Sequence, residues 1–384
     1  MKKRIVLLGA TGSIGRQTLD VVRHYPDEFE VRSLSAGRQW QQLVAAAREF
    51  EPDNVVIADE QYYRSVKDAL ADLPIKVYAG ADSLAQVAAG TEVDTVVNAL
   101  VGYAGMLPSL AAVRSGKELA LANKESLVVA GAIISREALA NHAPVIPIDS
   151  EHSAIYQCLS GEVSAPRRAI ITASGGPFLH TPAEQMACAT VEQALNHPNW
   201  SMGAKITIDS ATMVNKGFEV IEAHWLFGLD ADRIDVIVHP QSIIHSMVEF
   251  EDGALKAQLG VPDMRLPIQY ALRYPRREGC CTERFDFAAH PTLTFEEVDR
   301  ERFPMLPFAY DSLRRGGNAC CLMNAANEVA VAAFLERRIG FMDIARLITE
   351  ACARATFVAN PSLDDLQESN IETRRIAAEL INSL

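Results

Sequence analysis

Short apolar runs, many of them β-branched, alternate with amphipathic segments through the first 149 residues of the chain. Strands that are apolar throughout, rather than in every second position, are typical of a parallel sheet covered on both faces. The pattern therefore predicts an α/β fold that begins with a doubly wound, Rossmann-like parallel sheet. The strands that we expect are Ile5–Leu8, Glu30–Leu34, Asn54–Ile57, Thr95–Asn98, Glu118–Ala122 and Val145–Ile148.

The pattern changes after Asp149, where five runs predict a second, mostly antiparallel sheet accompanied by helices. These runs are Arg168–Thr172, Lys205–Asp209, Asp235–Val238, Ile244–Phe250 and Ala254–Leu259. Asp252-Gly253 marks a hairpin turn between the last two runs. A stretch punctuated by prolines, roughly 280–307, predicts a linker, and the apolar spacing beyond it predicts helices. We expect the last helix to begin at Ser362, which precedes two aspartates.

These changes divide the chain into four parts. We expect an NADPH-binding domain over 1–149 and a central α+β domain over 150–285 that carries the catalytic and metal site and the dimer contacts. A linker over 286–306 then leads to a C-terminal α-helical domain over 307–384.

Composition narrows the possible partners. The chain of 384 residues carries a net charge of −13, which argues against nucleic-acid binding. With this net charge, the protein can bind an anionic substrate only in a local basic pocket. No stretch approaches the roughly 20 apolar residues of a membrane span, and we expect no membrane partner. The seven cysteines have no disulfide-type spacing, which predicts a reducing, cytoplasmic location.

A glycine motif, Gly9-Ala10-Thr11-Gly12-Ser13-Ile14-Gly15, follows the first strand and precedes a helix that we expect near Arg16. Glycines allow a pyrophosphate to approach the backbone, and the helix N-terminus supplies free N–H groups. The end of the second strand, Ser35-Ala36-Gly37-Arg38-Gln39, has an arginine where NAD enzymes place an acid. A guanidinium suits a 2′-phosphate, which favours NADPH over NADH. The alternative is that Arg38 is a solvated surface charge.

Two acidic clusters predict a metal site. Asp149 and Glu151 flank Ser150 after the last parallel strand, and on extended backbone their side chains project to the same side. Two such carboxylates repel one another unless a cation lies between them, and oxygen ligands favour Mg²⁺ or Mn²⁺, with Co²⁺ as a further candidate. Helix N-capping by Asp149 or Ser150 is the alternative. Glu219 is the candidate third ligand, whereas Glu222 is a candidate outer or solvent-facing group.

The same region carries groups suited to a phosphate. Ser210, Asn215 and Lys216 offer a hydroxyl, an amide and an ammonium to an anionic substrate. Between the acidic clusters, 174–203 contains glycines at both ends, which predicts a flexible lid that closes over substrate. Trp200 is either a substrate contact in this lid or an anchor to the core, and His197 is either a substrate contact or a loop-ordering group.

Asn123-Lys124-Glu125 follows the strand 118–122. Because the carboxyl ends of parallel strands face the ligand crevice, Lys124 is a candidate substrate contact and its two neighbours are candidates to flank a nicotinamide. A surface turn is the alternative.

Taken together, the motifs resemble the 1-deoxy-D-xylulose 5-phosphate reductoisomerase family over nearly the full length. The matching stretches are GATGSIG (9–15), LANKES (121–126), IDSEHSA (148–154), SGGPF (174–178), HPNWSMG (197–203), DSATMVNKGFEVIEA (209–223), HPQSIIHSMVEFEDG (239–253), LGVPDMRLPI (259–268) and LMNAANEVAVAAFL (322–335). The resemblance implies a homodimeric enzyme of isoprenoid-precursor synthesis that converts 1-deoxy-D-xylulose 5-phosphate to 2-C-methyl-D-erythritol 4-phosphate with NADPH and a divalent metal.

The resemblance also implies roles for individual residues. The metal ligands fall on Asp149, Glu151 and Glu219, which with Lys124 form the implied catalytic set. The substrate contacts fall on Lys124, Ser150, Glu151, Ser174, His197, Ser210, Asn215, Lys216 and Glu219. The NADPH contacts fall on Thr11, Gly12, Ser13, Ile14, Gly37, Arg38, Gln39, Asn123, Glu125 and Gly203. Gln39 departs from the family, where asparagine is common, which affects only a detail of 2′-phosphate recognition.

Two other functions remain open at this level. A simple NADPH-dependent dehydrogenase for a phosphorylated or amino-acid-pathway aldehyde needs no metal, so sensitivity to a chelator separates it from the reductoisomerase. An NADP-sensing regulator binds the cofactor without turnover and gives no reason for three acids and a lysine to converge.

Overall fold

The computed structural model describes residues 1–279 and 281–383, which form two compact units. Unit 1 comprises 1–126, 132–153 and 263–283, and unit 2 comprises 127–131, 154–262 and 284–384. Each unit is assembled from separate stretches of chain, and the four-part division made from the sequence stays a prediction. Cys280 lies outside the described residues.

Unit 1 is built on a parallel sheet of seven strands in the order β4-β3-β2-β1-β5-β6-β7. The strands are β1 (Lys3–Leu8), β2 (Phe29–Ala36), β3 (Asn54–Ile57), β4 (Lys76–Ala79), β5 (Thr95–Asn98), β6 (Glu118–Leu121) and β7 (Val145–Pro147). The order runs outward from β1 in both directions, which confirms the doubly wound fold. β4 was missed because its residues alternate between exposed and half-buried and so lack the uniformly apolar pattern.

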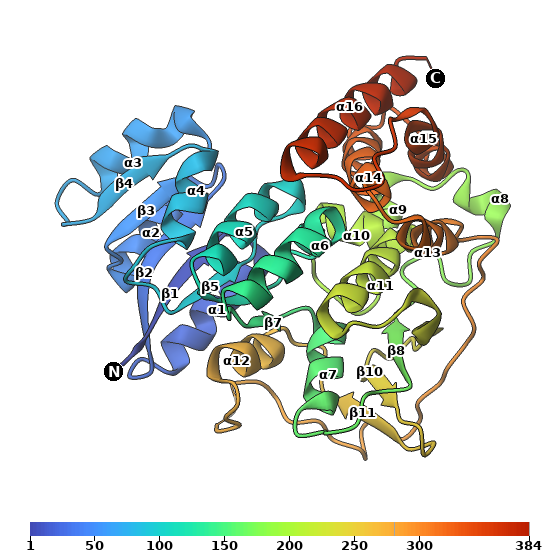
Figure 1. The fold of residues 1–384 in the computed structure, drawn as a ribbon, viewed down its shortest axis with the longest axis horizontal. Helices are drawn as coiled ribbons and strands as arrows, with labels where there is room; N and C mark the ends of the chain where they lie inside the picture. The colour runs from blue at the N-terminus through green and yellow to red at the C-terminus, as the bar shows by residue number, and fades with distance from the viewer. Residues whose placement is uncertain (280, 384) are drawn as a thin grey trace. The chain divides into compact units, whose positions relative to one another are not determined.

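The helices of unit 1 form the crossovers between these strands. They are α1 (Ser13–His24), α2 (Trp40–Phe50), α3 (Tyr63–Ala69), α4 (Ala81–Ala88), α5 (Met106–Arg114) and α6 (Glu125–Ala140). The strand order changes direction at β1. Because crossovers between parallel strands are right-handed, the helices of the two halves of the order lie on opposite faces of the sheet. Accordingly α2 packs with α3, and α4 packs with α5 (Figure 1). α12 (Arg265–Arg273) returns from late in the chain to pack on α1.

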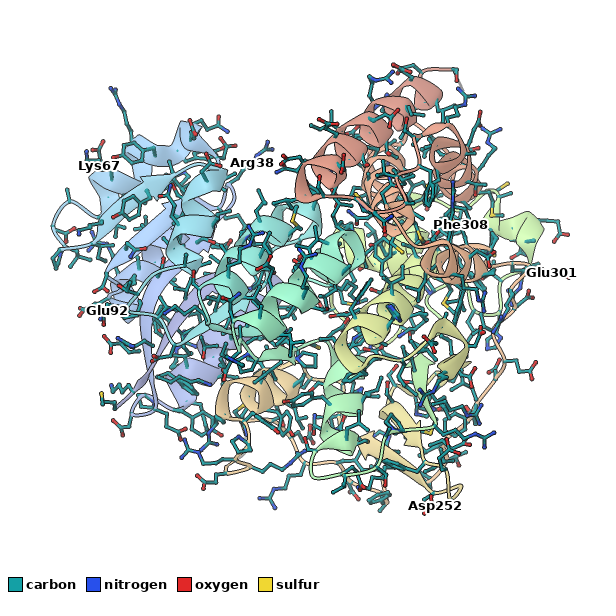
Figure 2. The ribbon with its side chains drawn as sticks, viewed as in Figure 1. Arg38, Lys67, Glu92, Asp252, Glu301 and Phe308 are labelled. Carbon is teal, nitrogen blue, oxygen red and sulfur yellow. The ribbon has the colours of Figure 1, made fainter. Side chains whose placement is uncertain are left out.

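Unit 2 contains a mixed sheet in the order β11-β10-β8-β9. β8 (Arg168–Ala173) runs parallel to β9 (Ile234–Val238), whereas β10 (Ile244–Glu249) is antiparallel to both β8 and β11 (Leu255–Leu259). The predicted hairpin is confirmed: Gly253 has a φ of +83°, and Asp252 lies beside it at the exposed tip (Figure 2). The segment predicted as a linker pairs with this sheet, because Val238 and Glu296 form an antiparallel bridge.

The predicted strand Lys205–Asp209 is wrong, since these residues lie in helix α10 (Ala204–Ala211). Ile206 and Ile208 alternate with polar residues as in a strand. In the structure Ile208 and Ala211 are fully buried three residues apart, and Lys205 pairs with Asp209 at 2.9 Å with i,i+4 spacing. Burial of this helical face outweighs the β preference of the two isoleucines.

Helices form the rest of unit 2, and Figure 1 shows α13 to α16 grouped together in brown and red. α11 packs on β8 and β9, α13 packs on α11, and α14 contacts α10, α13, α15 and α16. The helices are α7 (Ser150–Leu159), α8 (Ala183–Met186), α9 (Val191–Leu195), α11 (Val214–Phe227), α13 (Met305–Arg315), α14 (Ala319–Leu335), α15 (Phe341–Arg354) and α16 (Leu363–Ile381); α7 starts in unit 1. The N-cap Ser362 and Asp365 form a capping box, which confirms the predicted start of the last helix.

Among the described residues, no helix combines the length and the apolar character that crossing a bilayer requires.

We predict that Gly15→Ala destabilises unit 1, because a Cβ at Gly15 would lie 2.1 Å from the carbonyl oxygen of Gly9. Overpacking against backbone cannot be relieved by a rotamer change, so we expect a loss of about 2 kcal/mol or more in the free energy of unfolding. Urea denaturation followed by circular dichroism measures it. Gly37→Ala is the matched control, because nothing lies within 4 Å of the position that its Cβ would take. Equal stabilities of the two variants would contradict the prediction.

Candidate active site

The glycine loop joins β1 to α1 in a tight turn. Gly9 has a φ of +84°, and a Cβ there would lie 2.6 Å from the carbonyl oxygen of Ala99. The N–H of Gly9 donates to Ser35 Oγ at 2.9 Å, which ties the loop to the end of β2. α1 begins at Ser13, three residues earlier than predicted, and its N-cap Gly12 has no side-chain hydrogen bond. The free N–H groups of this first turn form an anion site.

Arg38 lies two residues beyond β2, at the surface of unit 1 (Figure 2). Its side chain is 80% exposed, and Nε donates to Asp59 Oδ2 at 3.0 Å. Hydrogen bonds from Gln61, with a smaller contribution from Arg38, lower the pKa of the Asp59 carboxyl. An exposed ion pair of this kind contributes little energy, so the guanidinium remains available to a ligand. Sequence reasoning missed Asp59, although its place after β3 was a usable signal.

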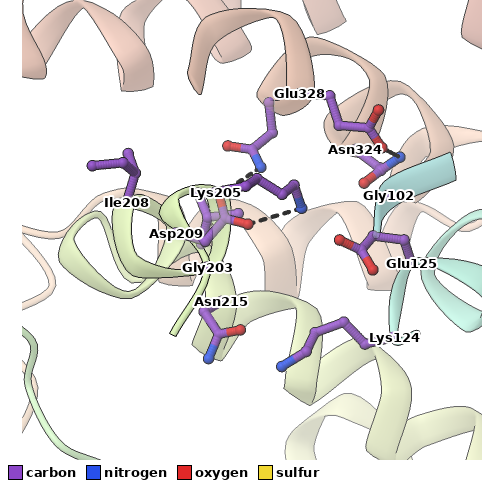
Figure 3. Close-up of polar contacts among 12 residues, drawn as sticks. Gly102, Lys124, Glu125, Gly203, Lys205, Ile208, Asp209, Asn215, Asn324 and Glu328 are labelled. Carbon is purple, nitrogen blue, oxygen red and sulfur yellow. Dashed lines mark hydrogen bonds and ion pairs between the residues drawn. The ribbon is translucent and has the colours of Figure 1, made fainter. Parts of the chain in front are cut away.

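Asn123, Lys124 and Glu125 are all buried at the carboxyl end of β6, which excludes the surface-turn alternative. Figure 3 shows the side chains of Lys124 and Glu125 at the start of α6. Asn123 Nδ2 donates to Glu125 Oε2 at 3.0 Å. The Lys124 ammonium forms an ion pair with the carboxylate of Asp149, so two predicted site residues meet within unit 1.

Asp149 and Glu151 do not both lie on extended backbone as predicted, because Glu151 is helical. β7 ends at Pro147 and α7 begins at Ser150, which places both acids around the first turn of a helix. Asp149 Oδ1 accepts the N–H of Ser150 at 2.9 Å, and Ser150 Oγ donates to Glu151 Oε2 at 2.5 Å. The positive end of the helix stabilises these carboxylates, so the capping alternative and the metal alternative are compatible.

In unit 2, Glu219 is 1% exposed on α11 and is held by its own helix. Asn215 Nδ2 donates to Glu219 Oε1 at 2.5 Å, and the Lys216 ammonium pairs with Oε2. Glu222 is fully buried one turn further on, so it is not the solvent-facing group that was one of its alternatives. Ser210 lies in α10, and Met213 joins α10 to α11 with a left-handed φ of +63°.

A buried link behind this segment was not foreseen. Asp209 is 2% exposed and accepts from Lys205 at 2.9 Å and from Asn327 Nδ2 of α14 at 2.8 Å. Figure 3 shows the Lys205 ammonium directed at the Asp209 carboxylate. The i,i+4 spacing of this pair was the signal in the sequence, and it marks a helix.

The segment predicted as a lid has a packed interior. Phe178, Met186 and Ala194 are buried in the hydrophobic core of unit 2, and the Phe178 ring lies 4.8 Å from that of Phe341. By contrast, 196–203 is exposed or half-buried throughout. Trp200 is half-buried there, with its ring 6.2 Å from that of His245.

His197 orders this exposed loop. Its Nδ1 accepts the N–H of Asn199 at 3.2 Å and of Trp200 at 3.0 Å, and its Nε2 lies 3.0 Å from Ser174 Oγ. An accepting Nδ1 requires the tautomer with hydrogen on Nε2, which then donates to Ser174. Burial, with a contribution from the Lys216 charge, lowers the pKa of His197.

The arrangement therefore presents a buried lysine–carboxylate pair in unit 1, Lys124–Asp149, and two in unit 2, Lys205–Asp209 and Lys216–Glu219. A buried carboxylate without a cation is costly, and the oxygens that these lysines neutralise are also suitable ligands for a hard divalent ion.

Three family models match most of the chain. They describe 1-deoxy-D-xylulose 5-phosphate reductoisomerase over residues 5–131, its C-terminal domain over 145–227, and the DXP reductoisomerase C-terminal domain over 259–376. The 1-deoxy-D-xylulose 5-phosphate reductoisomerase of Bacteroides thetaiotaomicron is 56% identical, covering 99% of this chain and 98% of that protein. That of Phocaeicola vulgatus is 53% identical over the whole of both chains.

Solved structures agree with these sequence relatives. A 1-deoxy-D-xylulose 5-phosphate reductoisomerase from Zymomonas mobilis in complex with NADPH superimposes with a TM-score of 0.93 at 44% identity, covering 100% of both chains. A DOX-P reductoisomerase in complex with NADPH, fosmidomycin and magnesium gives 0.93 at 39% identity, covering 99% of this chain and 98% of that one.

We predict that His197 titrates below the ordinary histidine pKa of about 6.5, because burial and the Lys216 ammonium both disfavour its charged form. Nuclear magnetic resonance titration of its ring protons measures this pKa, with His197→Gln assigning the signal. Lys216→Gln should raise the pKa, whereas Lys205→Gln, which removes another lysine of unit 2, should not. A titration at or above the ordinary value would refute the assignment.

Proposed function

The chain belongs to the 1-deoxy-D-xylulose 5-phosphate reductoisomerase family, and from this premise we propose that Asp149, Glu151 and Glu219 hold its divalent metal ion. The reaction converts 1-deoxy-D-xylulose 5-phosphate to 2-C-methyl-D-erythritol 4-phosphate with NADPH. The observation that carries the proposal is that each of the three acids has a polar partner. Asp149 forms an ion pair with Lys124, Glu219 forms one with Lys216, and Glu151 accepts a hydrogen bond from Ser150. When bound, the metal supplies Lewis acidity for the skeletal rearrangement, and NADPH supplies the hydride that reduces the resulting aldehyde.

The donor set fits Mg²⁺ or Mn²⁺, with Co²⁺ as a further candidate, because all three proposed ligands offer carboxylate oxygens. Lys124 and Lys216 pair with the carboxylates of Asp149 and Glu219 and so offset the cost of burying these acids. Ser150 donates to Glu151 and so restrains the orientation of its carboxylate. These contacts hold the three carboxylates in place, so the side chains have to move less when the metal ion binds.

NADPH fits the glycine loop and the end of β2. The N-terminus of α1 offers free N–H groups to the pyrophosphate, and exposed Arg38 offers its guanidinium to the 2′-phosphate. We propose that the NADPH contacts are Thr11, Gly12, Ser13, Ile14, Gly37, Arg38, Gln39, Asn123, Glu125 and Gly203.

The substrate phosphate is assigned to residues of unit 2. Ser210, Asn215 and Lys216 surround the turn between α10 and α11, and Ser174 and His197 are hydrogen-bonded to each other. We propose that these groups bind the phosphate and that Lys124, Ser150, Glu151, Glu219 and Trp200 contact the remainder of the sugar. Binding of the non-reacting phosphate supplies energy that orients the reacting carbons.

The predicted lid over 174–203 has a role in excluding water. Because Phe178, Met186 and Ala194 are packed in the core, we propose that movement is concentrated in 196–203, which carries Trp200. Closure of this loop would protect the aldehyde from hydration.

The assembly and location of the protein are also proposals. β11 is an edge strand with exposed Leu255, which supports a homodimer formed through this sheet. Cys188, Cys320, Cys321 and Cys352 are free thiols, which supports a reducing cytoplasmic location. The acidic net charge supports the absence of a nucleic-acid partner.

We predict that the purified protein oxidises NADPH only when 1-deoxy-D-xylulose 5-phosphate and a divalent ion are both present. Loss of absorbance at 340 nm measures turnover, and EDTA should abolish it until Mg²⁺ or Mn²⁺ is added back. Glu219→Gln should lower kcat at least ~100-fold, because it removes a charged ligand oxygen that no other group replaces.

Glu350→Gln is the control, because this exposed helical glutamate also pairs with a basic residue of its own helix. It should retain parental turnover. Turnover in the presence of EDTA would support a metal-free dehydrogenase and would refute the metal assignment.

We predict that Arg38→Ala lowers the preference for NADPH over NADH by ~10-fold or more, because the variant loses a charge-assisted contact to the 2′-phosphate. The ratio of kcat/KM for the two cofactors measures it. Arg48→Ala is the matched control, because Arg48 is exposed in the same unit and also pairs with an aspartate, Asp72. If the ratio of kcat/KM for the two cofactors is unchanged in Arg38→Ala, Arg38 is a solvated surface charge and not a ligand of the 2′-phosphate.

A further inference from the structure

Four buried polar side chains in unit 1 form a connected network, and only one of them, Asn123, has a role in the function proposed above. Asn98, Ser109 and Ser126 are fully buried, and Asn123 is 1% exposed. They come from the end of β5, from α5, from α6 and from the turn after β6, respectively. The network therefore joins four separate elements at the carboxyl edge of the parallel sheet.

The hydrogen bonds of this network run in one direction. Asn98 Nδ2 donates to Ser109 Oγ at 2.7 Å, and the hydroxyls of Ser109 and Ser126 lie 3.0 Å apart. Ser126 Oγ donates to Asn123 Oδ1, and Asn123 Nδ2 donates to Glu125 Oε2 at 3.0 Å. Because Ser126 directs its one hydroxyl hydrogen to Asn123, the hydrogen between the two serine oxygens comes from Ser109. The chain of donors thus ends on the carboxylate of Glu125.

The network also restrains the backbone on both sides of Lys124. The Ser126 N–H donates to Asn123 Oδ1 at 3.0 Å, which closes a turn around Lys124 and Glu125. The two hydrogens of Asn123 Nδ2 are shared among Glu125 and the carbonyl oxygens of Leu100 and Gly102, which also lie 3.0 Å from this nitrogen. Gly105 leaves the space for this amide, since a Cβ there would lie 2.2 Å from Asn123 Oδ1.

The other end of the network reaches the glycine loop. Asn98 Oδ1 accepts the N–H of Leu100 at 3.2 Å, which orients the peptide that follows Ala99. The carbonyl oxygen of Ala99 is the atom that a Cβ at Gly9 would meet at 2.6 Å. The loop after β5 is therefore in contact with the proposed pyrophosphate site on one side and with Asn123 on the other.

An apolar cluster would stabilise this edge at lower desolvation cost, because buried polar groups contribute favourably only when all are satisfied. We propose that the network sets the position of Lys124 and Glu125 relative to the glycine loop, which makes Asn98, Ser109 and Ser126 positioning residues for the reductoisomerase reaction. This inference rests on the proposed function of Lys124 and Glu125. None of the three positioning residues has to contact substrate or cofactor for it to hold.

Ser109→Ala tests the proposal, because it removes the central hydroxyl without adding volume. We expect kcat to fall ~10-fold or more, since small misplacements of a catalytic group are costly. The Kd for NADPH, measured by its fluorescence, should rise by less than kcat falls, because the glycine loop and Arg38 still bind the pyrophosphate and the 2′-phosphate even where Asn123 and Glu125 are displaced.

Ser33→Ala is the matched control for the loss of a buried serine. Ser33 is 1% exposed in the same sheet and donates to Asn54 Oδ1 at 2.6 Å, at the first residue of β3 and so away from the carboxyl edge. It should lower the thermal midpoint as much as Ser109→Ala and leave kcat at the parental value. Equal kcat values for the two serine variants would overturn the proposal.

The double variant Ser109→Ala/Ser126→Ala shows whether the two hydroxyls affect kcat through one connected network or independently of each other. If the two hydroxyls act through one chain, the double substitution should lower kcat no further than the larger single effect. If the two single effects multiply, the proposed chain is overturned. Turnover of the parent protein in the same assay establishes the proposed function, so a failure among these variants counts against the network alone.

Discussion

Neutralisation of buried carboxylates is the constraint on which the candidate active site depends. Asp149 in unit 1 pairs with Lys124, and Glu219 in unit 2 pairs with Lys216. A carboxylate that is buried without a paired cation loses its hydration and gains nothing in return, which is costly. The chain thus keeps negative oxygens in its interior at a cost that the paired ammonium groups largely offset.

The parallel sheet of unit 1 brings the cofactor and substrate candidates to one edge. The glycine loop follows β1, Arg38 follows β2, Lys124 follows β6 and Asp149 follows β7. Residues distant in the chain become neighbours there because parallel strands end on the same side. Gly9 and Gly15 are required because backbone atoms occupy the space that a Cβ would need, and the buried network from Asn98 to Glu125 holds the same edge from within.

Unit 2 supports its acidic residues from behind with helices. α11 carries the buried Glu219 and Glu222 and itself packs on β8, β9 and α13, and Gly217 lies on the face toward α13. Asn327 of α14 reaches Asp209 in α10, so the C-terminal helices restrain the segment that carries Ser210. A helical region that sequence alone identified only as a separate domain is therefore part of the support for the proposed phosphate site.

The sequence by itself determined the parallel strands, the glycine loop, the hairpin at Gly253 and the identity of the family, because each has a local pattern of apolar, glycine or motif residues. It placed β3 and β5 to the residue. Only the tertiary structure decided that Lys205–Asp209 is helical, that Asp149 and Glu151 lie at a helix start, and that Glu296 pairs with Val238. In these cases local preference is weak or ambiguous, and burial against distant elements selects the conformation. The network of Asn98, Ser109, Ser126 and Asn123 belongs to the same class, because a hydrogen bond between remote side chains leaves no periodic pattern in the chain.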